Sequence, residues 1–328
     1  MSFLRFEPIF QERVWGGRAL ADYLGRSLPA GKPIGESWEI VDRPEANSRV
    51  RGGEHDGKTL REVIEADAER VMGPEWERTR VFPILVKWLD CRERLSLQVH
   101  PPAEIALSLG GEPKTENWFV ARAEPGAGVL AGLVDGVDAE KFRAALANNT
   151  AEKLLIRHET RAGDSILIHS GVMHAIDGGN VILEIQQNSD TTYRVYDWGR
   201  VGLDGKPRQM HVEQSLACLK ANRAPAPRLL RAGEPGDVLA DCAEFRLRRV
   251  RLARGAKLEV AAREQPRLLS VVEGKLMAGD GAHADGAGER DANIVARGEN
   301  VLLPFAEAFS FGAADDTIAL ITENFVRT

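Results

Sequence analysis

Four side chains in this 328-residue sequence have the types and spacing of metal ligands. Gln98 and His100 stand two positions apart in an apolar run, so in a strand both project from one face. Glu116 and His174 follow along the chain, and Gly171 allows a tight turn just before that histidine. Two imidazoles, one carboxylate and one amide suit zinc or another first-row divalent ion. This set contains no thiolate, which disfavours structural zinc, and it leaves a position open for substrate, which implies catalysis.

Each of these residues also has an ordinary structural interpretation. A single histidine in a strand is more often a hydrogen-bonded core or surface residue than a ligand, and a single glutamate is usually a solvated charge. His174 stands apart because it follows a turn glycine in an otherwise apolar run. Spacing alone therefore favours metal binding without deciding it.

The elements that must position these residues are mainly β. Residues 81–90 are mostly apolar, as expected of a strand buried on both faces, and Lys87 within them must reach solvent or a polar cavity. Residues 115–123 alternate as in a strand that begins near Glu116. Further strands are expected at residues 165–168 and 181–187. Helical spacing occurs at residues 58–66, 138–146 and 150–157.

The composition shifts to Pro and Ala around residues 222–227, which suggests a linker. Short β-type runs separated by glycines follow it, a pattern typical of sandwiches and barrels. We therefore expect two β domains, the first decorated by small helices.

Composition and charge narrow the class of protein. The net charge of −6 argues against a nucleic-acid surface, although it leaves room for a local basic pocket. Cys91, Cys218 and Cys242 are far apart and predict reduced thiols, not a disulfide framework. No long apolar run is present, so we expect a cytoplasmic protein with no membrane partner.

Several stretches together resemble a known family. Residues 163–174 look like the second cupin motif, and the wider pattern resembles type I mannose-6-phosphate isomerases in their short bacterial form. The matching stretches are VWGG (14–17), GESWE (35–39), LSLQVHP (95–101), KTE (114–116), SGVMHAI (170–176) and EIQQNSDTTYRVYDWGR (184–200). The resemblance covers roughly residues 5–220 well. It implies two cupin-type β-sandwich or jelly-roll barrels: a catalytic domain over residues 1–222, and a degenerate domain over residues 223–328 without a metal site.

The resemblance also implies roles for particular residues. The residues matching the family's zinc ligands, for one Zn²⁺ per chain, are Gln98, His100, Glu116 and His174. Arg194 matches its active-site arginine. The residues matching polar groups around the metal are Lys87, Lys114, Glu184 and Asp190. His169 stands where the family usually has proline, and we do not count it as a ligand.

The implied reaction interconverts mannose 6-phosphate and fructose 6-phosphate through an enediol. Arg194 stays charged, so it suits stabilising the enediolate or orienting hydroxyls. The proton carrier needs a pKa near the working pH, and Lys114, Glu184 and metal-bound water all remain open. Candidate phosphate contacts are Ser96, Lys87 and Arg200.

Two alternatives remain. One is a cupin isomerase for another sugar phosphate or for free mannose. The other is a non-catalytic, sugar-binding regulatory cupin, which Lys114, Glu184 and Arg194 disfavour because binding needs no proton carrier. We expect a monomer or weak homodimer. His283, the one histidine of the C-terminal segment, is interpreted as a solvated loop residue.

Overall fold

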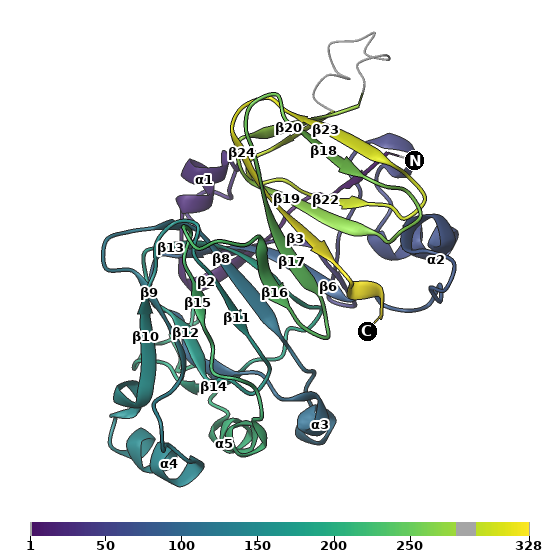
Figure 1. Ribbon diagram of the computed structural model, residues 1–328. Helices are drawn as coiled ribbons and strands as arrows, with labels where there is room; N and C mark the ends of the chain where they lie inside the picture. The colour runs from purple at the N-terminus through teal and green to yellow at the C-terminus, as the bar shows by residue number, and fades with distance from the viewer. Residues whose placement is uncertain (1, 280–292, 328) are drawn as a thin grey trace. The chain divides into compact units, whose positions relative to one another are not determined.

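The computed structural model describes residues 2–279 and 293–327, so His283 lies outside the described residues. The fold is mainly β, with antiparallel strands and few helices, as predicted. The chain divides into two compact units (Figure 1). The first, here called the site unit, contains Phe10–Ser37 and Lys87–Glu234, and the second contains Met1–Ile9, Trp38–Val86 and Pro235–Thr328. The sequence predicted one domain boundary, after residue 222, whereas each of these units contains more than one segment of the chain. The predicted domains therefore stay a prediction.

The predicted ligands lie on or beside the strands of two sheets. The seven-stranded sheet has the order β15 (Leu229–Leu230), β11 (Ser165–Ile168), β8 (Glu116–Ala123), β13 (Asn180–Gln187), β6 (Ile84–Cys91), β3 (Ile34–Ile40) and β2 (Ile9–Gly17). The five-stranded sheet has the order β10 (Leu155–Glu159), β9 (Gly128–Leu133), β12 (His174–Ile176), β7 (Leu97–Val99) and β14 (Tyr193–Tyr196). The helix expected at residues 150–157 was wrong. A 3₁₀ turn and the start of β10 occupy it, because pairing of β10 with β9 overrides the local helical pattern.

A shared core joins these two sheets. Trp118 and Ile166 of the first sheet pack in one buried cluster with Val129 and Ile176 of the second. This face-to-face packing is that of a β-sandwich. It places the inward-facing residues of both sheets opposite one another.

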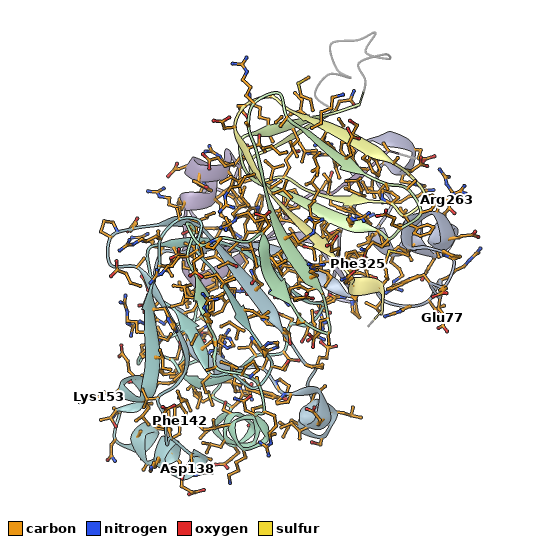
Figure 2. The ribbon with its side chains drawn as sticks, viewed as in Figure 1. Glu77, Asp138, Phe142, Lys153, Arg263 and Phe325 are labelled. Carbon is orange, nitrogen blue, oxygen red and sulfur yellow. The ribbon has the colours of Figure 1, made fainter. Side chains whose placement is uncertain are left out.

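Short helices flank the site unit. They are α1 (Ala19–Leu24), α3 (Ala103–Ala106), α4 (Ala139–Ala147) and α5 (Val212–Ala221). Asp138 caps α4 by accepting the backbone N–H of Lys141 at 2.8 Å, which agrees with the expected helix start. Phe142 of α4 is fully buried in a cluster with Leu97 of β7, whereas Asp138 is exposed (Figure 2). α4 and α5 contact one another, and α5 contacts β14 (Figure 1).

The second unit is also β-rich. Its strands are β1 (Leu4–Arg5), β4 (Asp42–Arg43), β5 (Ala46–Asn47), β16 (Val238–Asp241), β17 (Arg246–Leu252), β18 (Lys257–Val260), β19 (Arg267–Glu273), β20 (Lys275–Ala278), β21 (Ile294–Ala296), β22 (Asn300–Leu303), β23 (Phe309–Ala313) and β24 (Thr317–Glu323). They form sheets ordered β1-β22-β19-β24-β17-β16, β18-β23-β20-β21 and β4-β5. The helix predicted at residues 58–66 is α2 (Leu60–Met72), which begins with a Thr59–Glu62 capping box. None of the helices in the described ranges has the length and apolarity to cross a bilayer.

Candidate metal centre and active site

Strand pairing brings three distant parts of the sequence together at β7. Gln98 is in register with His174 of β12 on one side and with Arg194 of β14 on the other. His100 directly follows β7, and Glu116 begins β8 in the facing sheet. The site is therefore assembled by sheet register and sandwich packing.

His100, Glu116 and His174 form a compact, fully buried cluster. One possible ligand atom from each lies within 4.8 Å of the others. The Nε2 atoms of His100 and His174 lie 3.5 and 3.4 Å from the Glu116 carboxylate. The Gln98 amide reaches the same place, with Nε2 3.2 Å from His174 Nε2. The structure thus brings all four predicted ligands together.

Backbone carbonyls orient both imidazoles. His100 Nδ1 donates to the Thr191 carbonyl at 2.7 Å, and His174 Nδ1 donates to the Val172 carbonyl at 2.9 Å. A carbonyl only accepts, so each Nδ1 carries the proton and each Nε2 presents its lone pair. This arrangement of the second nitrogen is typical of metal-binding histidines.

The cluster has unsatisfied atoms that a cation would complete. In the part of the chain that the structure describes, His100 Nε2 and both Glu116 oxygens are buried without a hydrogen bond, and Glu116 Oε2 has only its ion pair with Lys114 at 3.0 Å. Buried polar atoms are otherwise almost always partnered. Because all three converge on one point, the residues present fit a divalent first-row cation.

The protonation states are also those of ligands. Burial, reinforced by the positive charge of Lys114, lowers the pKa of His100 to about 3, so its imidazole is neutral at pH 7. Burial likewise lowers the pKa of His174. Burial opposes charge on Glu116, but Lys114 and His100 outweigh it and hold the pKa of this carboxyl well below its usual value. Metal binding needs neutral imidazole and ionised carboxylate.

Two further ionisable groups stand beside the cluster. Lys114 Nζ lies 3.0 Å from Glu116 Oε2, and the attraction of Glu116 and Glu184 overcomes the effect of burial and raises the pKa of Lys114. Burial, together with the negative charge of Glu116, raises the pKa of Glu184 to about 7. The Trp118 indole donates to Glu184 Oε1 at 2.9 Å. A carboxyl that titrates near pH 7 is suited to proton transfer.

A cavity of about 560 Å³ lies within the site unit, and Gln98 lines it whereas His100, Glu116 and His174 do not. The predicted residues that line it are Lys87, Ser96, Gln98, Lys114, Glu184, Asp190 and Arg194. Ser96 links two of them, since it donates to Gln98 Oε1 and accepts from Arg194 Nε, both at 3.3 Å. Arg200 is not among the lining residues. It donates instead to the Arg94 carbonyl and to Asp197.

Five charged residues of the cavity wall were not predicted: Glu12, Arg13, Glu36, Asp204 and Arg208. Arg13 donates to both Glu36 oxygens, at 3.1 and 3.0 Å. This pair adjoins the VWGG and GESWE stretches, where a Cβ on Gly16 would lie 2.3 Å from the Gly35 nitrogen. Those glycines were the available signal for Arg13 and Glu36, and the sequence offers none for Arg208.

Comparisons with known proteins agree with the resemblance. A family model described as the phosphomannose isomerase type I catalytic domain matches residues 3–132. Mannose-6-phosphate isomerase ManA of Bacillus subtilis is 35% identical over 279 residues, 83% of this chain and 86% of that protein. The mannose-6-phosphate isomerase of Streptococcus mutans is 39% identical over 230 residues, 67% of this chain and 71% of that protein.

Solved structures match over nearly the whole chain. The crystal structure of the Bacillus subtilis mannose 6-phosphate isomerase superposes with a TM-score of 0.84 at 27% identity, covering 98% of this chain and all of that one. A mannose 6-phosphate isomerase bound with zinc and yttrium has the same fold, with a TM-score of 0.71 at 18% identity over 98% of this chain and 99% of that one. With 35% identity over most of both sequences, the chain belongs to the family of type I mannose-6-phosphate isomerases.

Proposed function

We propose that this enzyme interconverts mannose 6-phosphate and fructose 6-phosphate, with one zinc ion held by Gln98, His100, Glu116 and His174. The observation that carries the proposal is the buried cluster of His100, Glu116 and His174, whose ligand atoms lie within 4.8 Å of one another; Gln98 beside it lines a cavity together with Lys114, Glu184 and Arg194. When bound, a divalent cation supplies Lewis acidity that polarises a substrate carbonyl.

The proton moves between the first and second carbons of the open-chain sugar. Glu184 is the carrier that the electrostatics favour, because a pKa of about 7 lets it take and return a proton at neutral pH. As a carboxylate, Glu184 removes the proton from C2 of mannose 6-phosphate. As a carboxylic acid, it returns that proton to C1, while the hydroxyl proton of O2 passes to O1, which gives fructose 6-phosphate.

Two cationic side chains, Lys114 and Arg194, can stabilise the negative charge that develops on the substrate oxygens. Lys114 carries a raised pKa, so it remains an ammonium and donates hydrogen bonds from Nζ. Arg194 stays charged, and Ser96 holds its Nε from the floor of the cavity. Together they orient the substrate oxygens and stabilise the enediolate.

A coupled assay tests this function. Zinc-loaded protein is expected to convert mannose 6-phosphate to fructose 6-phosphate, to stop in chelator, and to recover when zinc is restored. Parallel arms with free mannose and another aldose phosphate compare the rival substrates. Absence of turnover of mannose 6-phosphate by the zinc-loaded protein overturns the proposal.

A further inference from the structure

The charged groups of the cavity separate into an acidic end and a basic end. At the acidic end Lys87 Nζ lies 3.7 to 4.0 Å from carboxylate oxygens of Glu36, Glu184 and Asp190. Arg13 is held on Glu36 as well. Two cations among three carboxylates leave no excess positive charge, so this end does not attract a dianion.

The basic end is built on β14 and the segment that follows it. Arg208 makes a bidentate contact with Asp197, with Nε 2.7 Å from Oδ2 and Nη2 2.5 Å from Oδ1. Arg200 Nη2 shares the same carboxylate at 2.8 Å. One carboxylate therefore serves two arginines, and Arg194 nearby adds a third positive charge. Asp204 also lines the cavity here, so three arginines face two carboxylates and this end keeps an excess of positive charge.

Two of these arginines keep a donor for a ligand. Nε and Nη2 of Arg208 are engaged by Asp197, and Nε and Nη1 of Arg194 are engaged by Ser96 and the Gln209 carbonyl. Within residues 2–279 and 293–327, Nη1 of Arg208 and Nη2 of Arg194 have no hydrogen-bond partner. Both arginines line the cavity, whereas Arg200 does not.

A small hairpin places Arg208 at the rim. Val201 bridges Pro207, and the Gly202 N–H donates to the Lys206 carbonyl at 2.6 Å. Leu203 and Asp204 in this hairpin also line the cavity, and both are exposed. The Asp197 contact anchors Arg208 at the end of the hairpin, with its side chain only 18% exposed.

We propose, on the basis of the function proposed above, that Arg208 binds the substrate phosphate through Nη1, and that Asp197 is a positioning residue that aims Arg208. A guanidinium with one free edge is suited to phosphate oxygens. Two successive contacts of 3.3 Å, through Ser96, connect Arg194 to the Gln98 amide. Arg208 lines the same cavity as Gln98, so a sugar with C1 and C2 at the metal ligands can direct its C6 phosphate toward Arg208.

The test compares Arg208→Gln with Arg143→Gln. Arg143 makes the same kind of bidentate contact, with Glu213 at 2.6 and 2.8 Å, but on the exposed surface away from the cavity. Arg208→Gln is expected to raise the KM for mannose 6-phosphate and the Kd for inorganic phosphate by about 10- to 100-fold. Its kcat/KM for free mannose and its zinc content should stay within about twofold of wild type, and Arg143→Gln should match wild type throughout.

Two conservative variants test the positioning role. Arg208→Lys keeps the charge but loses the bidentate contact, so its KM should lie between those of wild type and Arg208→Gln. Asp197→Asn should raise the KM for mannose 6-phosphate while leaving kcat nearly unchanged. A fall in kcat with unchanged KM in Asp197→Asn overturns the positioning role.

Other outcomes are also decisive. Unchanged phosphate affinity and KM in Arg208→Gln, or a parallel loss with free mannose, overturns the phosphate assignment while leaving the isomerase function intact. If wild type turns over no mannose 6-phosphate, the proposed function fails. Titration with inorganic phosphate then still decides the anion site, and wild-type protein that binds no inorganic phosphate overturns it.

Discussion

Lys114 Nζ lies 3.0 Å from Glu116 Oε2, and both side chains are buried. The lysine therefore places a positive charge against a carboxylate that also faces two imidazoles. This pair stabilises the charge of Glu116 in metal-free protein. A bound cation must share the carboxylate with this ammonium.

Lys114→Met is accordingly expected to bind zinc more tightly and to turn over more slowly. Removing a positive charge next to a ligand removes repulsion of the metal, an effect of about tenfold in Kd after screening by the surroundings. The loss of an ammonium donor to the substrate should lower kcat by about 100-fold or more. Competition with a chelator of known affinity measures the first effect, with exposed Lys141→Met as the control. Weaker zinc binding in Lys114→Met would show that the lysine assists the metal site.

His174→Ala is expected to lose zinc. The variant removes the buried Nε2 atom that faces Glu116. The Val172 carbonyl, which holds the imidazole in wild type, cannot replace this nitrogen as a ligand. Elemental analysis of the purified protein should give near-stoichiometric zinc for wild type and a large deficit for the variant. His169→Ala is the matched control, since His169 lies five residues earlier and outside the ligand cluster. Full zinc in His174→Ala would remove this histidine from the ligand set.

Arg194→Ala should separate chemistry from metal binding. Arg194 stands next to Gln98 in the sheet but contacts Ser96 and Gln209, not the cluster. Turnover is expected to fall by about 100- to 1,000-fold with zinc near stoichiometric, because a donor to developing negative charge is lost. Steady-state kinetics and elemental analysis on one preparation provide the check. Loss of metal in this variant contradicts the assigned role.

Local patterns explain what could be predicted from the sequence. The spacing of Gln98 and His100 on one strand face, and the caps at Thr59 and Asp138, depend on neighbours a few residues away. Residues 150–157 show where such patterns fail. Their helical spacing is real, but pairing with β9 makes their second half part of a strand.

Local sequence patterns do not predict the register between strands or the charge pairs between residues far apart in the chain. The resemblance grouped His174 with Gln98 as ligands, but nothing in the sequence predicted that the two stand opposite each other in a sheet. Lys87 was expected near phosphate, whereas the folded chain surrounds it with carboxylates of three separate segments. Arg208 can be identified as a site residue only from the structure, in which Asp197 and the hairpin place it on the cavity wall.

Glu184 provides the prediction that depends on pH. Its pKa of about 7 lies above the ordinary value of 4.5, so the folded protein holds a proton that the unfolded chain has already released between these pH values. The free energy of unfolding of the metal-free protein therefore falls as the pH rises from about 4.5 to about 7, because the folded state must release this proton. Glu184→Gln should remove this loss, and chemical denaturation at pH 5 and pH 8 measures it. Exposed Glu213→Gln is the control.

The same carboxyl should set the acidic limb of activity. If Glu184 accepts the C2 proton, kcat rises with pH through the pKa of this carboxyl, and Glu184→Gln lowers kcat by about 100-fold or more and removes that limb. Trp118→Phe deletes the indole N–H that favours the ionised form, so it should move the limb upward by up to about one pH unit. An unchanged limb in both variants would exclude Glu184 as the proton carrier and leave Lys114 and metal-bound water as the candidates.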